Sequence, residues 1–171
     1  MRKSGVAMSE TALPPHLSPV PPTGFCPPVG AGGVEPREGE LAYGFSLPAT
    51  AAAPVVAHET AELLFDIHRV YALAEPGLAL ARELTAYACR FAREGQDVHL
   101  TLHQRAGTLR LDVYDPHACS GCAGQRHDGL RQARTLVRPY GGVCGFGAAE
   151  RCGAGTRTWA TLTDTPRRWA A

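Results

Sequence analysis

Val98-His-Leu-Thr-Leu-His103 and Thr108-Leu-Arg-Leu-Asp-Val-Tyr114 are the stretches of this 171-residue chain that decide its fold. Apolar and polar residues alternate in both, which is the period of a half-buried β-strand. Only Gln104-Arg-Ala-Gly107 separates them, and so short a connection joins antiparallel neighbours. The pattern predicts a β-hairpin with one face on a core and His99 and His103 on the solvent side.

Two amphipathic helices are predicted before the hairpin, after a short edge strand over 42–48. The first runs from about Pro54 to Ala74, and Glu75-Pro-Gly77 separates it from the second, over about 78–93. The apolar residues expected to face the core are Val55, Val56, Leu63, Leu64, Ile67, Val70 and Tyr71 in the first helix and Leu80, Leu84, Tyr87, Ala88 and Phe91 in the second.

The rest of the folded part is predicted to be a polar loop over 115–128, a helix over 129–137 and strands over 142–147 and 156–162. Helices covering one face of a mixed, mostly antiparallel sheet are the natural packing for this order of elements. The expected fold class is therefore α+β, a two-layer sandwich over residues 41–164.

Two tails are expected outside this domain. Residues 1–40 hold most of the fourteen prolines and no periodic apolar pattern, so a disordered, Pro/Gly-rich tail is predicted there. Residues 165–171 are expected to be a short C-terminal tail.

Composition excludes several classes of function. The net charge of +1 gives no strong field for nucleic acid or membranes. No stretch approaches the ~18–20 apolar residues of a membrane span, and no hydrophobic run follows the charged start as in a signal peptide. A cytoplasmic protein with reduced thiols is expected. Lys3 is the only lysine, which excludes lysine chemistry within the folded part.

Four ordered motifs carry a resemblance to a known family. They are Glu83-Leu-Thr-Ala-Tyr-Ala-Cys-Arg90, Leu111-Asp-Val-Tyr-Asp115, His127-Asp-Gly-Leu130 and Gly153-Ala-Gly-Thr156. In this order they resemble the Bergerat-type ATPase domain of gyrase-like enzymes, heat-shock chaperones and histidine kinases. Within that family, the motifs resemble those of the small bacterial anti-sigma-factor serine/threonine kinases.

The resemblance implies a histidine-kinase-like ATPase fold and an ATP-binding regulatory protein that phosphorylates a partner's serine. That partner would be a sigma factor or an anti-sigma-factor antagonist, and a homodimer is a possible assembly. Glu83 would be the catalytic general base. Asp115 would accept a hydrogen bond from the adenine amino group, and Mg²⁺ would bridge the phosphates. The expected cofactor-binding residues are Asp115, Gly129, Leu130, Gly153, Gly155 and Thr156.

The sequence departs from the family on the phosphate side of the expected site. Tyr87 stands where the family has the asparagine that coordinates magnesium, and His127 replaces a glycine. Magnesium requires oxygen ligands in octahedral geometry, and a phenol replaces an amide carbonyl poorly. The alternative function is therefore a catalytically dead pseudo-kinase that acts as a protein-interaction module.

A further alternative rests on the cysteines. Cys119-Ser-Gly-Cys122 has the spacing of half a zinc site, which Cys144 and Cys152 could complete; His117 and His127 could complete a mixed site instead. A thiol–disulfide switch and unpaired thiols are the other interpretations. Because this segment corresponds to the mobile ATP lid of the family, a redox- or zinc-responsive regulator is a third hypothesis.

Overall fold

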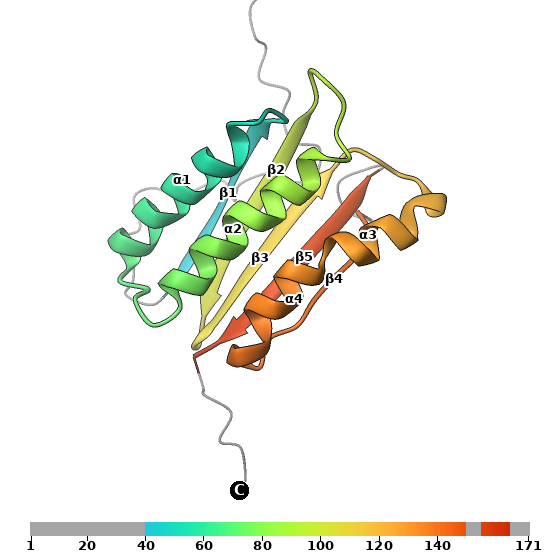
Figure 1. Cartoon of the computed structure of the whole chain (residues 1–171). Helices are drawn as coiled ribbons and strands as arrows, with labels where there is room; N and C mark the ends of the chain where they lie inside the picture. Colours follow the sequence, from blue (N-terminus) through green and yellow to red (C-terminus); the bar gives the residue numbers. More distant parts are fainter. Residues whose placement is uncertain (1–39, 150–154, 165–171) are drawn as a thin grey trace, which may run out of the picture.

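The computed structural model describes residues 40–149 and 155–164. The elements of these residues are β1 (Leu41–Pro48), α1 (Ala53–His68), α2 (Ala74–Cys89), β2 (Asp97–Arg105), β3 (Thr108–Asp115), α3 (Ala123–Gly129), α4 (Arg131–Val137), β4 (Cys144–Ala148) and β5 (Thr156–Thr163), with 3₁₀ turns at Ser120–Cys122 and Arg138–Tyr140. The strands form one open antiparallel sheet of order β1-β2-β3-β5-β4. The α-helices cover one face of this sheet, with α2 central, α1 on the β1 side and α3 and α4 on the β5 side (Figure 1). The α+β class is confirmed.

The predicted hairpin is present as β2 and β3. Arg105 pairs with Thr108, so the connection is the two-residue turn Ala106-Gly107. Both turn residues have positive φ, 50° and 73°, as the favoured type of two-residue hairpin turn requires. The pairing of Leu102 with Leu111 then places buried leucines of both strands on the helix-covered face.

The boundary between the first two helices lies earlier in the chain than predicted. Arg69 adopts φ 54° and ends α1, and α2 already begins at Ala74. Pro76 is tolerated because the first turn of a helix leaves its N–H groups unbonded. Gly77 is required by packing, since a Cβ there would lie 2.7 Å from Leu109 Cδ2 and 2.8 Å from Phe65 Cε2. The predicted break is thus the first turn of α2.

The predicted core face of the first helix is confirmed for Val70, which is buried, and in part for Leu64, which packs half-buried against the core, but it is wrong for the other five residues. Ala57, Ala61 and Phe65 are buried, whereas Leu63 and Ile67 are 61% and 48% exposed. Ala57 and Ala61 let α1 lie close to the neighbouring elements, and Phe65 is the large apolar side chain that it buries. The exposed apolar residues of this segment, called here the α1 outer stripe, are Val55, Val56, Leu63, Ile67 and Tyr71.

The segment predicted as a loop over 115–128 contains a 3₁₀ turn and α3. Arg126 is the only buried residue of α3. The helix therefore has no apolar stripe that would mark it in the sequence. The prediction was wrong here because a buried charged side chain, not an apolar stripe, attaches this helix to the domain.

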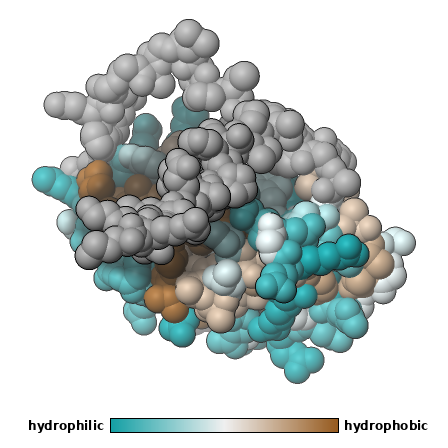
Figure 2. All heavy atoms as spheres, turned by 90° about the horizontal axis from the view of Figure 1, so that it is seen from above, coloured by the Kyte–Doolittle hydropathy of each residue, from teal (hydrophilic) through white to brown (hydrophobic). Residues whose placement is uncertain are grey.

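Figure 2 views the molecule from the end at which β1 finishes and α1 begins; on the part of the surface that is not drawn in grey, hydrophobic patches lie between hydrophilic residues. No helix among the described residues is long and apolar enough to cross a membrane.

Candidate functional site

The candidate site lies where β3 ends and β5 begins, beneath α3. Asp115, the last residue of β3, is 3% exposed, and it pairs with Thr156 on β5. A Cβ on Gly155 would lie 2.5 Å from the carbonyl oxygen of Asp115, so only glycine permits this close approach of the two chain segments. The expected adenine-side residues Asp115, Gly155 and Thr156 are therefore brought together.

Both carboxylate oxygens of Asp115 accept hydrogen bonds from Arg126 of α3. Its Nη1 donates to Oδ2 at 2.9 Å and its Nη2 to Oδ1 at 2.8 Å, in the bidentate geometry that is strongest for such pairs. The Arg126 residue is only 1% exposed. Both oxygens of the expected adenine acceptor are thus bonded to the chain's own guanidinium.

Further contacts hold the guanidinium plane in place. The Arg126 Cζ atom lies 3.9 Å from the centroid of the Phe91 ring, a cation–π contact. Arg126 Nη2 also donates to the carbonyl oxygen of His117 at 3.2 Å. Burial alone lowers the pKa of Arg126, but the hydrogen bonds and charge of Asp115 outweigh it, so the pKa is raised. Arg126 Nε has no hydrogen-bond partner among the described residues.

The hydroxyl of Thr156 is also hydrogen-bonded within the chain. Its Oγ1 donates to the His117 carbonyl oxygen at 2.7 Å, and the His117 N–H donates to Asp115 Oδ1 at 3.0 Å. The Arg126 guanidinium stacks on the Phe91 ring and donates in-plane hydrogen bonds to the Asp115 carboxylate. An adenine ring would make contacts of the same type. The carboxylate of Asp115 and the hydroxyl of Thr156, which the resemblance assigns to nucleotide binding, are thus both hydrogen-bonded within the chain.

On the phosphate side, Tyr87 fills the space between α2 and α3. It is 1% exposed, and its hydroxyl donates to the Arg126 carbonyl oxygen at 3.3 Å. A Cβ on Gly129 would lie 2.8 Å from Tyr87 Cε2, so the glycine expected beneath the phosphates makes room for this ring instead. Burial raises the pKa of Tyr87, which keeps the phenol neutral.

The remaining predicted site residues are placed as follows. Leu130 is fully buried in the core between α3 and α4. Glu83 is half-buried on α2, one helical turn before Tyr87. Gly153 and Cys152 lie outside the described residues. With Tyr87 and Arg126 in these positions, the described arrangement does not fit a magnesium–nucleotide complex, although Glu83 remains accessible.

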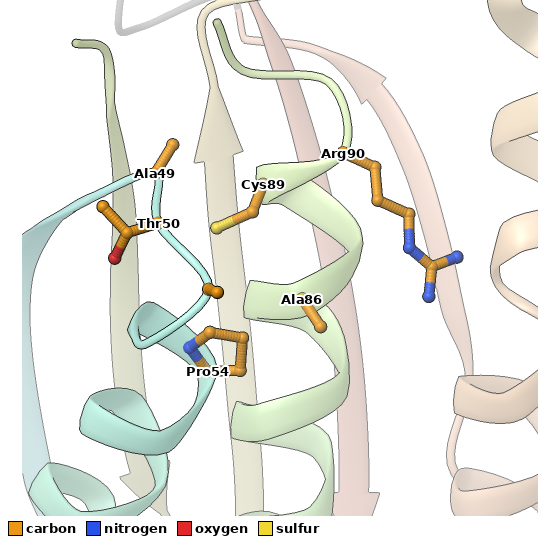
Figure 3. Close-up of a pocket in the computed structure, with 7 residues that line it drawn as sticks. Ala49, Thr50, Pro54, Ala86, Cys89 and Arg90 are labelled. Carbon is orange, nitrogen blue, oxygen red and sulfur yellow. The ribbon is translucent and has the colours of Figure 1, made fainter. Parts of the chain in front are cut away.

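Two cavities flank this region. One, of about 500 Å³, lies beside the ion pair and is lined in part by Ser120, Arg126, Phe146 and Thr156. The other, of about 330 Å³, lies between the start of α1 and the end of α2. In Figure 3 the Cys89 sulfur points into the second cavity toward Ala49 and Thr50, whereas Arg90 points to the opposite side of α2.

The segment between β3 and α3 brings three potential metal ligands together. One donor atom each of His117, Cys119 and Cys122 lies within 4.8 Å of the other two. Cys144 on β4 and the exposed His127 on α3 both lie outside this cluster. The four-cysteine site is therefore not assembled by the described residues. The four described cysteines, Cys89, Cys119, Cys122 and Cys144, are free thiols.

Arg126 and Phe91 are the site residues that sequence reasoning missed as functional. Arg126 lies in a polar segment without apolar periodicity, so no pattern distinguished it from a solvated arginine. Phe91 was recognised only as a continuation of the apolar stripe of α2. The sequence signal that could have identified Arg126 was its position after Asp115, the expected ligand-binding aspartate, within the same short segment.

No protein-family model matches this chain, and no curated protein is similar to it in sequence.

Proposed function

We propose that this chain is a regulatory protein-interaction module, resembling the anti-sigma-factor serine/threonine kinases in architecture but acting without bound nucleotide. One observation carries the proposal: Arg126 makes a buried bidentate ion pair with Asp115, the residue expected to bind adenine. A buried charge pair of this geometry is costly to break, because separation leaves a desolvated charge without a partner.

The α1 outer stripe supports an interaction role. Leu63 and Ile67 lie one turn apart on the outside of α1, with Val55 and Val56 further toward its start. The five exposed apolar residues of the stripe lie on or just after one helix, and gathered apolar residues of this kind are typical of protein-binding surfaces. The proposed partner is a sigma factor or an anti-sigma-factor antagonist that contacts this stripe.

The experiment that tests this proposal measures binding of the full chain to sigma factors and anti-sigma-factor antagonists, with and without Mg-ATP. The dissociation constant is expected to be unchanged by Mg-ATP. The double variant L63Q/I67Q should lose binding, whereas R131Q, an exposed substitution on α4, should not. Binding that depends strongly on ATP, or that survives L63Q/I67Q, contradicts the proposal.

A second candidate function is an active ATP-dependent kinase with Glu83 as its base. The half-exposed carboxylate of Glu83 and the cavity beside Arg126 favour this candidate. It requires Arg126 to leave Asp115 and Tyr87 to leave the phosphate side. Phosphate transfer to a partner's serine that is abolished by E83Q would support it over the nucleotide-free module.

A further inference from the structure

We infer that His117, Cys119 and Cys122 form a zinc-binding site that fixes the Asp115–Arg126 ion pair in place. This metal site is independent of the proposed partner binding. It differs from a four-cysteine site in its histidine ligand and in the position of that ligand next to Asp115.

The distances suit a single zinc ion. His117 Nε2 lies 3.3 Å from Cys122 Sγ, and all three donor atoms lie within 4.8 Å of each other. In a tetrahedral site with Zn–S of about 2.3 Å and Zn–N of about 2.0–2.1 Å, ligand atoms lie about 3.5–3.8 Å apart. Small side-chain adjustments therefore bring all three atoms into the zinc coordination sphere.

The chemistry of the donors favours zinc over harder cations. Two thiolates and one imidazole are the ligands that zinc prefers, whereas magnesium and calcium prefer oxygen. Zinc binding displaces one proton from each thiol to solvent, and the two thiolates balance the charge of the ion. The described residues supply three ligands, and the exposure of Cys119 leaves the fourth position accessible to water or another donor.

The histidine ligand has a rigid support. The backbone of His117 makes three hydrogen bonds, from its N–H to Asp115 and to its carbonyl oxygen from Arg126 and Thr156. Its ring also lies 6.0 Å from the Phe91 ring, which stacks on Arg126. These bonds fix the main chain from which the His117 ring projects. Zinc would thus connect the turn at Ser120–Cys122 to the groups that hold Arg126 on Asp115.

The competing outcome at this position is a Cys119–Cys122 disulfide. Such a bond would use the same two sulfur atoms but would leave His117 without a role. The approach of the His117 ring nitrogen to Cys122 Sγ is the observation that favours the metal.

The test uses the full chain purified without a histidine tag under reducing conditions. Zinc content is measured by elemental analysis, and affinity by competition with a chromophoric chelator. One zinc per chain is expected, and substitution with Co²⁺ should give the absorption bands of a tetrahedral thiolate site. C119S is the mildest ligand variant because Cys119 is exposed, and it should weaken zinc binding more than about 100-fold, beyond the loss typical of outer-shell changes.

Matched controls are C89S and C144S, which alter half-buried thiols outside the cluster and should leave zinc affinity unchanged. H117A should weaken zinc binding as strongly as C119S, an effect that a two-cysteine site or a disulfide does not predict. Binding of no zinc by the reduced chain overturns the inference. The same conclusion follows if H117A and C119S bind zinc as tightly as the controls, or if a Cys119–Cys122 disulfide forms and zinc does not bind after its reduction.

Discussion

The α1 side and the Asp115 end of this domain distribute polarity in opposite ways. On α1, large apolar residues such as Leu63 and Ile67 are exposed, while alanines face the core. At the Asp115 end, an aspartate and an arginine are almost fully buried. Each arrangement is unfavourable compared with the usual apolar interior and polar surface.

The two departures have different consequences. Exposed apolar residues leave a surface available for a partner, whereas the buried ion pair removes a carboxylate from any external ligand. Under the proposed function, recognition would lie on α1 and the Asp115 end would stay closed to nucleotide.

The largest effect is expected from breaking the buried ion pair. Asp115→Asn should lower the free energy of unfolding by about 3–5 kcal/mol, because the Arg126 charge remains buried without its partner. The double variant D115N/R126M should recover much of this loss, since no unpaired charge remains. Chemical denaturation measures both values. Equal stability of D115N and wild type would show that the ion pair does not form in solution.

A comparably large difference should separate two neighbouring apolar residues of α1. Phe65→Ala removes a side chain that is 2% exposed and should cost about 3–5 kcal/mol of unfolding free energy. Leu63→Ala removes one that is 61% exposed and should change stability by less than about 0.5 kcal/mol. Thermal and chemical unfolding provide the comparison. If Leu63→Ala were more destabilising than Phe65→Ala, the buried face of α1 would be the one that the apolar pattern predicts.

A smaller loss is expected on the phosphate side. Gly129→Ala places a Cβ 2.8 Å from Tyr87 Cε2, and the overpacking should destabilise the fold by about 1–3 kcal/mol. Tyr87→Ala in the same chain should relieve this clash, so the two substitutions should be strongly non-additive. Additive losses would indicate that the Tyr87 ring lies elsewhere.

The smallest effect is expected from Tyr87→Phe. This substitution removes the hydrogen bond to the Arg126 carbonyl oxygen and should cost about 0.5–1.5 kcal/mol near neutral pH. Burial raises the pKa of Tyr87, so the unfolded chain loses the tyrosine proton first, and wild-type stability falls as pH rises above about 10. Y87F should lack this part of the decrease. Identical alkaline profiles for both proteins would contradict the buried position of the phenol.

The sheet and the helix order were predictable because their signals are local. Alternation in 98–103 and 108–114 specified the hairpin, and Leu80, Leu84, Tyr87 and Ala88 marked the buried face of α2 correctly. The face of α1 was not predictable, since both sides of that helix carry apolar residues. Which side is buried depends on the close approach of neighbouring elements, such as the contact between Phe65 and Gly77.

The candidate site was predictable only in part. The juxtaposition of Asp115 with Gly155 and Thr156 followed from the order of the motifs. The closure by Arg126 did not, because a pairing of charges across a helix and a strand end leaves no periodic signal in the sequence. The clustering of His117 with Cys119 and Cys122 was one of several ligand sets that the spacing left open.

Calorimetric titration of the full chain with Mg-ATP tests most directly whether the Arg126–Asp115 ion pair closes the expected nucleotide site. The ion pair and the buried Tyr87 predict that the wild-type chain shows no binding at millimolar Mg-ATP. Micromolar binding that is lost in D115N would contradict this account, because it would show that Asp115 is available to the nucleotide.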